Sequence, residues 1–232
     1  MAAKKAAPRK AHKRAQPSNA AGCESMRRKI LHAVLAEVPF DGWTEAAYSR
    51  ALKQAGISRG EADLLFAAGL RDVIDAFGDW ADRAMQEKID AEPGFERFKV
   101  RDKITFAVRA KLEALTPHRE AVRRLMFWYA MPLHAPLGAK RLYKTVDLMW
   151  RAAGDASTDF NFYTKRGLLA GVLKTTMLFW FDDESPDCRA SWDFLDRRIG
   201  EVLKVGKAIS LAKEWTPSEF IGFVKGRLRR RA

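Results

Sequence analysis

Residues 54–61 read Gln-Ala-Gly-Ile-Ser-Arg-Gly-Glu, and this stretch decides the fold of the N-terminal region. A glycine turn followed by a serine at the start of the next helix is typical of a helix-turn-helix. Glu61 stands three residues after Ser58, the spacing of a capping box, in which the hydroxyl and the carboxylate satisfy exposed backbone amides. The pattern predicts three short helices, over 26–37, 44–54 and 58–66.

The rest of the chain also has helical spacing of its apolar residues. Leu70, Val73, Ile74 and Phe77 stand at i, i+3, i+4 and i+7, which is one face of a helix. Glycine and proline residues recur at intervals that suit helix ends, and no stretch alternates cleanly between polar and apolar residues. We therefore predict an all-α protein of nine or ten helices.

The composition suits one sizeable globular domain, with 232 residues of which 47% are hydrophobic and 31% charged. The net charge of +13 comes from the two ends, residues 1–29 and 225–231, whereas residues 30–224 are neutral. This distribution argues against a broad nucleic-acid-binding face and favours ends that meet an anionic surface. Residues 1–25 combine lysine and alanine without an apolar face, which predicts a disordered basic tail.

Several classes of protein are excluded by what the sequence contains. Two cysteines cannot build a disulfide scaffold or a four-thiolate metal site, and they favour reduced thiols in an intracellular protein. The sequence contains no run of 18 uninterrupted apolar residues, so it predicts no transmembrane helix. The four histidines lack the spacing of metal ligands, and no phosphate-binding glycine motif occurs. We expect no metal site, no catalytic residues and no enzyme activity.

The run from Ile30 to Phe66 resembles the N-terminal domain of the TetR family of repressors. The resemblance implies a TetR-like fold, in which a helix-turn-helix precedes a helical body for ligand binding and dimerisation. That family places a tyrosine, a histidine and a lysine against the DNA backbone, where this chain has Asp63, Leu65 and Gly69. Because a carboxylate repels phosphates, we expect a scaffold that binds no nucleic acid. A TetR-type, ligand-responsive transcriptional repressor is the alternative.

Residues 157–166, Ser-Thr-Asp-Phe-Asn-Phe-Tyr-Thr-Lys-Arg, resemble the accessory lipid-binding family of ubiquinone biosynthesis, the ninth of the coenzyme Q proteins. Residues 147–155 and 185–199 carry the same resemblance, which covers about residues 26–230. It implies a homodimer that binds an isoprenoid lipid and delivers a quinone intermediate to the di-iron demethoxyubiquinone hydroxylase. It implies no cofactor apart from the bound lipid. The resemblance also implies a cellular location, at the cytoplasmic side of the inner membrane in bacteria or at the matrix side in mitochondria.

Two segments, 125–131 and 167–181, are apolar on every side of a helix. Such a helix is either wholly buried or lines a cavity on one side. Methionine and aromatic residues in it suit a long, flexible ligand, although ordinary core packing explains the same composition. The candidate lipid-binding residues are Phe127, Met131, Leu168, Leu169, Val172, Leu173 and Met177.

A partner-binding patch is implied by the same resemblance. Phe162 and Tyr163 are adjacent, so one of the two rings must point away from the core, as interface anchors do. The alternative is a helix cap at Asp159 with Tyr163 half-buried. The residues that the family's hydroxylase-binding patch assigns here are Met149, Asp159, Phe162, Tyr163 and Arg166.

The C-terminal segment 215–231 predicts an amphipathic helix. Phe220, Phe223, Val224 and Leu228 share one face, and lysine and arginine residues crowd the other. This composition favours a helix that lies flat in a membrane surface, and packing on the domain or on a second copy is the alternative. The candidate membrane-binding residues are Trp215, Phe220, Phe223, Val224, Lys225 and Leu228.

Taken along the chain, these expectations divide it into four regions. They are a disordered basic tail (1–25), a helix-turn-helix-like region (26–90), a helical lipid-binding and dimerisation region (91–212) and an amphipathic membrane-binding helix (213–232).

Overall fold

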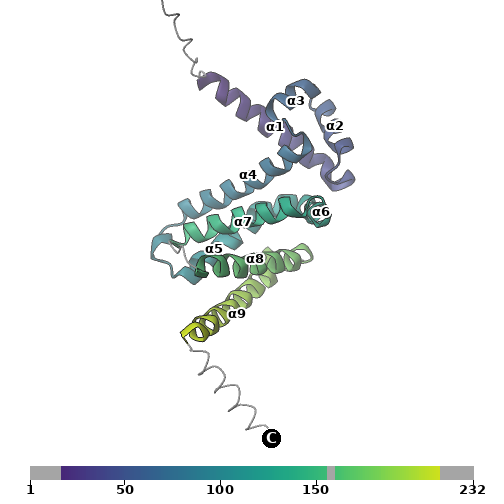
Figure 1. The fold of residues 1–232 in the computed structure, drawn as a ribbon. Coiled ribbons are helices and arrows are strands. Elements are labelled where there is room, and N and C mark those ends of the chain that lie inside the picture. Colours follow the sequence, from purple (N-terminus) through teal and green to yellow (C-terminus); the bar gives the residue numbers. More distant parts are fainter. Residues whose placement is uncertain (1–16, 156–159, 215–232) are drawn as a thin grey trace, which may run out of the picture. The chain divides into compact units, whose positions relative to one another are not determined.

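The structure is a computed structural model that describes residues 17–155 and 160–214. Within those ranges every regular element is a helix, which confirms the all-α prediction (Figure 1). None of the helices in the described part is long and apolar enough to cross a membrane. The elements are α1 (Pro17–Asp41), α2 (Glu45–Gln54), α3 (Arg59–Leu65), α4 (Leu70–Ala91), α5 (Val100–Leu115), α6 (Arg119–Ala130), α7 (Ala135–Ala152), α8 (Phe160–Phe181) and α9 (Arg189–Glu214), with short 3-10 turns at Phe95–Arg97, Thr116–His118 and Pro186–Cys188.

The chain forms two compact units, of which the first ends at Ile74 and the second begins at Asp75. The division expected from the sequence, at residue 90, falls at the end of α4, whereas the boundary between the two compact units falls inside that helix.

The first unit contains the expected helix-turn-helix. Gly56 takes the left-handed conformation (φ 66°) in the turn between α2 and α3. The Ser58 hydroxyl accepts from the backbone amide of Glu61, and the Glu61 carboxylate accepts from the amide of Ser58, so the capping box is present. Thr44 caps α2 through the amide of Ala47 in the same way. The predicted starts at 44 and 58 are therefore the cap residues of these helices.

Helix α1 is longer than the sequence predicts. It runs from Pro17 to Asp41 rather than from 26 to 37, so residues 17–25 are helical where a disordered tail was expected. Residues 21–25 are exposed, and an exposed helix carries no apolar stripe for periodicity to detect. Pro17 at the first helical position has the backbone angle that a helix needs and no amide that must be satisfied.

The second unit is a bundle in which α7 lies between α4 and α8, and α9 packs on the far side of α8 (Figure 1). Helix α5 packs against both α7 and α9. The core residues of this unit that are fully buried include Val108, Leu112, Val146, Met149, Trp180 and Leu195.

The loop between α8 and α9 is held by one buried carboxylate, Asp183. It accepts the backbone amides of Ser185 (2.9 Å) and Ser191 (2.8 Å) and both of their hydroxyls. Although burial raises the pKa of Asp183, these hydrogen bonds hold it down at about 2. The Ser185 hydroxyl also accepts a hydrogen bond from the backbone amide of Ala190 (2.9 Å), in the first turn of α9.

Replacing Asp183 with Ala should lower the free energy of unfolding by about 2 kcal/mol at neutral pH, because two buried and two part-buried donors lose their acceptor. Because the pKa of Asp183 is lower in the folded state, its ionised carboxylate stabilises the fold at pH values above its unfolded-state pKa, near 3.8. That stabilisation disappears as the pH falls toward 2. Urea unfolding at several pH values should therefore show the difference between wild type and variant closing over that range. The control is Glu184→Ala at the exposed neighbour. A constant difference between pH 7 and pH 2 would contradict the role of the charge.

Candidate functional site

The second unit encloses an apolar cavity of about 400 Å³. This volume falls in the range of small-molecule sites. Residues of five helices, α4 to α8, line it. Four of them are exposed, so the cavity reaches the surface: Ala130, Ala135, Ala139 and Lys174. Its apolar wall includes Phe77, Ala81, Leu115, Val122, Leu125, Met126, Leu142, Leu173 and Met177.

Close approach of α6 and α7 shapes one side of the cavity. A Cβ atom on Gly138 would lie 2.8 Å from Cγ of Tyr129, so only glycine lets the tyrosine ring pack against α7 at this point. Burial raises the pKa of Tyr129, with Asp75 adding to the effect, so the hydroxyl in the cavity wall keeps its proton at neutral pH.

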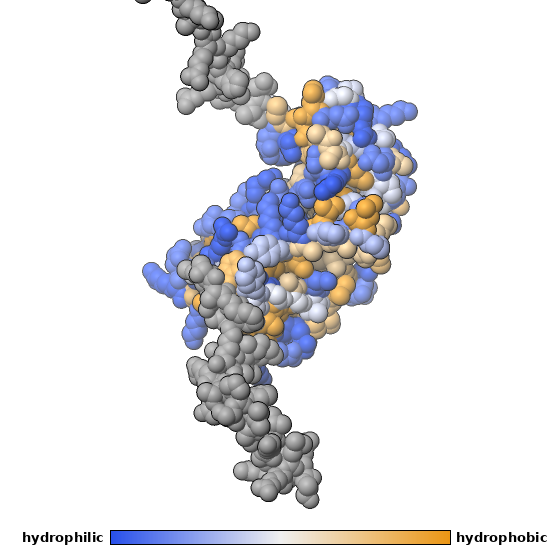
Figure 2. Space-filling view, in the orientation of Figure 1, coloured by the Kyte–Doolittle hydropathy of each residue, from blue (hydrophilic) through white to orange (hydrophobic). Residues whose placement is uncertain are grey.

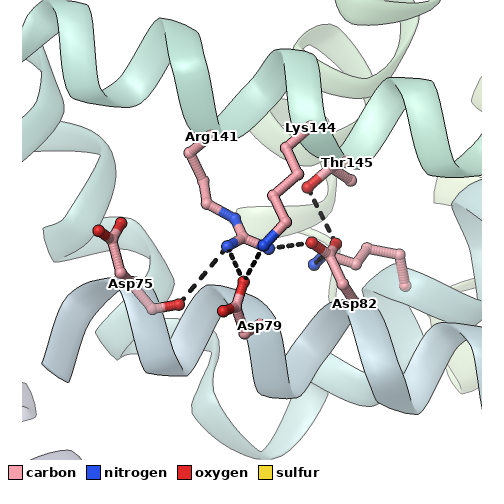
Figure 3. A network of polar contacts seen from close by, with 7 residues as sticks. Asp75, Asp79, Asp82, Arg141, Lys144 and Thr145 are labelled. Atoms are coloured by element: carbon pink, nitrogen blue, oxygen red, sulfur yellow. Dashed lines mark hydrogen bonds and ion pairs between the residues drawn. The ribbon is translucent and has the colours of Figure 1, made fainter. Parts of the chain in front are cut away.

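A cluster of charged side chains joins α4, α5 and α7 at the cavity, and we call it the Asp82 cluster: Asp79, Asp82, Lys111, Arg141, Lys144 and Thr145. Figure 3 shows Arg141 and Lys144 of α7 pointing toward Asp79 and Asp82 of α4. Asp82 accepts from Lys111 Nζ (2.7 Å) and the Thr145 hydroxyl (2.9 Å), and it also accepts from Arg141. Three helices are thereby tied to one carboxylate.

The second carboxylate of the cluster, Asp79, lies closer to the surface. It accepts from Arg141 and from Lys144 Nζ (2.7 Å). Burial raises the pKa of Asp79, but the hydrogen bonds from these two cations outweigh it and hold the pKa below its ordinary value. A Cβ atom on Gly78 would lie 2.5 Å from Nε of Arg141, so glycine at this position of α4 leaves room for the guanidinium to reach both carboxylates.

The side chains of the cluster differ in solvent exposure. The side chains of Asp82 and Lys111 are 5% and 7% exposed, whereas those of Asp79 and Lys144 are 40% and 54% exposed. Lys111, Arg141 and Thr145 line the cavity, and the carboxylates are not among its lining residues. Burial lowers the pKa of Lys111 to about 7, against the opposing effect of Asp79. The cluster contains two carboxylates and three basic side chains, so its net charge is positive whenever Lys111 is protonated.

The structure places the candidate lipid-binding residues in three different environments. Leu173 and Met177 line the cavity. Leu169 and Val172 are buried on α8 and Leu168 is half-buried there, but none of the three lines the cavity. Phe127 and Met131 are exposed, at 69% and 52%.

The expected helices thus supply the cavity wall, but α6 does so through residues that the sequence did not single out. These are Val122, Leu125, Met126, Tyr129 and Ala130. Because residues 125–131 are apolar all round, spacing could not tell which side of the helix faces inward.

Lys111, Arg141 and Thr145 were missed altogether. The available signal was the i, i+3 and i, i+4 spacing of charged residues on two amphipathic helices, Asp79 with Asp82 on α4 and Arg141 with Lys144 and Thr145 on α7. That spacing equally describes a solvated helix face, so the sequence alone could not identify a buried cluster.

The candidate partner-binding residues are only partly at the surface. Tyr163 is 69% exposed, and Phe162 is half-buried with the Arg166 guanidinium carbon 3.3 Å from its ring centre. Arg166 is buried and pairs with Asp147 (2.7 Å) and Asp155 (3.2 Å). Phe162, Tyr163 and Arg166 are therefore brought together at the start of α8.

The remaining candidate residues offer no exposed surface in the described structure. Met149 is fully buried on α7, and Asp159 lies outside the described residues. The six candidate membrane-binding residues, from Trp215 to Leu228, also lie outside them. In the described ranges, no three His, Cys, Asp or Glu side chains gather closely enough to hold a metal ion.

Hydrophobic residues also reach the surface of the molecule between hydrophilic ones (Figure 2). On α8 the large ones are Tyr163, Leu178 and Phe179, and Phe179 stacks on Phe194 of α9 with ring centres 4.7 Å apart. Gly167 and Gly171 of α8 are exposed, and a Cβ atom on either would meet nothing within 4 Å in the described structure. Helix α8 therefore has an outward face of small and apolar residues that also includes the exposed Lys174.

Residues 135–206, which form α7, α8 and part of α9, match the model of the COQ9 family. The chain is 32% identical over 196 residues to the mitochondrial ubiquinone biosynthesis protein COQ9 of Rattus norvegicus, covering 82% of this chain and 62% of that protein. It is 31% identical over 196 residues to the Homo sapiens protein of the same name, covering 82% of this chain and 61% of that protein. The chain thus spans about three fifths of the length of these curated relatives.

Among solved structures, the chain is similar to a TetR transcriptional regulator from Nitrosomonas europaea. The TM-score is 0.64 at 23% identity, and the match covers 77% of this chain and 98% of that one. This likeness concerns the fold and confirms the TetR-like architecture. The chain is therefore a homologue of the COQ9 proteins, built on a TetR-like fold.

Proposed function

We propose that this protein is an accessory lipid-binding protein of ubiquinone biosynthesis, which holds an isoprenoid quinone intermediate in its cavity and presents it to the demethoxyubiquinone hydroxylase at a membrane. The role is one of binding and delivery rather than catalysis. The names of the COQ9 relatives support the pathway. The relatives are mitochondrial proteins, which is consistent with a place at the inner mitochondrial membrane or its bacterial counterpart.

The observation that carries the proposal is the apolar cavity. Two of the helices that wall it, α7 and α8, fall inside the segment that matches the COQ9 family. Its lining is mostly aliphatic and aromatic, which favours a hydrocarbon ligand through removal of apolar surface from water. Met126 and Met177 adapt their shape easily, so a flexible isoprenoid chain can be accommodated.

The start of α8 supports the partner part of the proposal. The Tyr163 ring projects from a rigid base, because Arg166 fixes Phe162 on one side and pairs with Asp147 and Asp155 on the other. Exposed aromatic residues held in this way are typical anchors of protein interfaces. The hydroxylase is the partner that we assign to this surface.

The outward face of α8 supports a homodimer. Gly167, Gly171 and Leu178 lie at i, i+4 and i+11, on one side of the helix, and all three are exposed. Small residues on such a face permit a second helix to approach closely, and Leu178 adds apolar area to the contact. A second copy of the chain is the occupant that we assign to it.

A TetR-type repressor is the competing function, and it is favoured only by the fold. Arg59, the first residue of α3, pairs with Asp63 (3.0 Å) and with Glu45 (3.2 Å). A guanidinium already held by two carboxylates contributes little to phosphate binding, because binding must first break those pairs. The helix-turn-helix is better explained as a scaffold.

Replacing Met177 with Trp should reduce the amount of isoprenoid lipid that co-purifies with the protein, because the indole would occupy cavity volume. Replacing the neighbouring Leu178 with Trp should leave the lipid content unchanged, because Leu178 is 53% exposed and does not line the cavity. Mass spectrometry of extracted lipid, normalised to folded protein, makes the comparison. Equal lipid content in Met177→Trp and Leu178→Trp would overturn the cavity as the lipid site.

Replacing Tyr163 with Ala should weaken binding of the hydroxylase about tenfold or more, since truncation of an aromatic anchor commonly removes over 1.4 kcal/mol. The matched control is Tyr143→Ala, an exposed tyrosine on α7. Surface plasmon resonance with immobilised hydroxylase measures both variants, and lipid content should be unaffected in each. The assignment fails if the two variants bind the hydroxylase equally well.

The repressor alternative makes the opposite prediction for DNA. We expect no sequence-dependent mobility shift with genomic fragments at near-physiological salt, because Arg59 is already paired with Glu45 and Asp63 and a carboxylate repels phosphates. Tight binding to a particular fragment, resistant to competitor DNA, would favour the repressor instead.

A further inference from the structure

The polar part of the cavity wall has a consistent chemical character. Its polar side chains are those of Lys111, Tyr129, Arg141, Thr145 and Lys174, and no carboxylate or carboxamide side chain is among the residues that line it. Asp79 and Asp82 lie behind the cations rather than in the lining. The wall therefore presents N–H and O–H groups and positive charge to whatever the cavity holds.

Lys111 is the buried lysine of this wall, and it has donors to spare, whereas Lys174 is exposed. An ammonium has three N–H donors, and Asp82 is the one acceptor that the described residues give it, at 2.7 Å. Thr145 and Arg141 donate to the same carboxylate, so Asp82 has little capacity left for a second hydrogen bond from Lys111. The Thr145 hydroxyl proton is already used in that contact.

Leaving some N–H donors of a buried ammonium without acceptors is costly. The Lys111 side chain is 7% exposed, and burial disfavours its charged form. An oxygen atom placed in the cavity against Nζ would supply the missing acceptor and offset the lost hydration. A cationic head group would meet repulsion from the same wall, since the cluster carries more cations than carboxylates.

We propose that Lys111 is the head-group donor of the cavity, and that it selects a lipid whose aromatic head carries a ring oxygen, as a quinone carbonyl or a phenol does, while the apolar wall holds the tail. This inference rests on the proposed function and adds to it the polar subsite and its residue. Asp82 acts as a positioning residue, because it holds the Lys111 ammonium at the cavity wall and does not itself line the cavity.

The test compares the full-length chain with two variants and three probes. The probes are a benzoquinone with a decyl chain, decylbenzene, which has the same tail without a ring oxygen, and decanoate, which carries an oxygen acceptor but no ring. The variants are Lys111→Met, which removes the donor but leaves Asp82 with Arg141 and Thr145, and Lys144→Met, a control in the same cluster that does not line the cavity. Equilibrium dialysis measures the affinities.

We expect wild type and Lys144→Met to bind the quinone more tightly than decylbenzene. Lys111→Met should lose about tenfold or more of the quinone affinity and keep that for decylbenzene, because a hydrogen bond to a charged group is lost. Unchanged quinone affinity in Lys111→Met would overturn the subsite while lipid binding stands. Tighter binding of decanoate than of the quinone would overturn the ring-oxygen class. Binding of neither hydrocarbon-tailed ring compound by wild type would overturn the proposed function itself.

A second readout needs no variant, so the proposal stays testable even if Lys111→Met does not fold. A hydrogen bond from an ammonium lowers the stretching frequency of a quinone carbonyl, and isotope-edited infrared spectra of the bound probe report that frequency. We expect one carbonyl band of the bound quinone to shift to lower frequency relative to the probe in hydrocarbon solvent. Two unshifted bands would overturn the proposal.

Discussion

The second unit depends on the placing of one buried carboxylate, Asp82. It is a member of α4, and it accepts from Lys111 of α5 and from Arg141 and Thr145 of α7. Removing a charge from water is expensive, so a buried carboxylate persists only where several donors converge on it. The need to keep these donors together fixes the relative positions of the three helices. The cavity lies among those helices, and its shape follows from the same constraint.

An apolar cavity of this size is itself a cost to the fold, because its lining forgoes the contacts that a packed core would make. Polar groups in its wall restrict which ligand can restore those contacts. Lys111, Arg141 and Thr145 come from α5 and α7, whereas α8 contributes Leu173 and Met177 together with the exposed Lys174. A ligand with one polar end and one hydrocarbon end matches this division.

The fold could be predicted further from the sequence than the site could. The Ser58–Glu61 capping box is a local pattern that forms wherever the helix forms, so α3 was predicted to within a residue at each end. The exposed start of α1 has no such pattern and was missed. For the cavity, apolar composition identified α8, yet on α6 it favoured exposed Phe127 over buried Leu125. Lys111 could not be found at all, since burial of a lysine depends on partners from two other helices.

The first unit has the features that a helix-turn-helix needs in order to fold. They are its turn, its caps and its apolar core, with Tyr48 and Phe66 fully buried. None of those features requires a basic face. In this chain Arg59 is paired with Glu45 and Asp63 on its own surface, so the cation is balanced inside the motif. The balance differs in the Asp82 cluster, where three cations meet two carboxylates and two of those cations, Lys111 and Arg141, line the cavity.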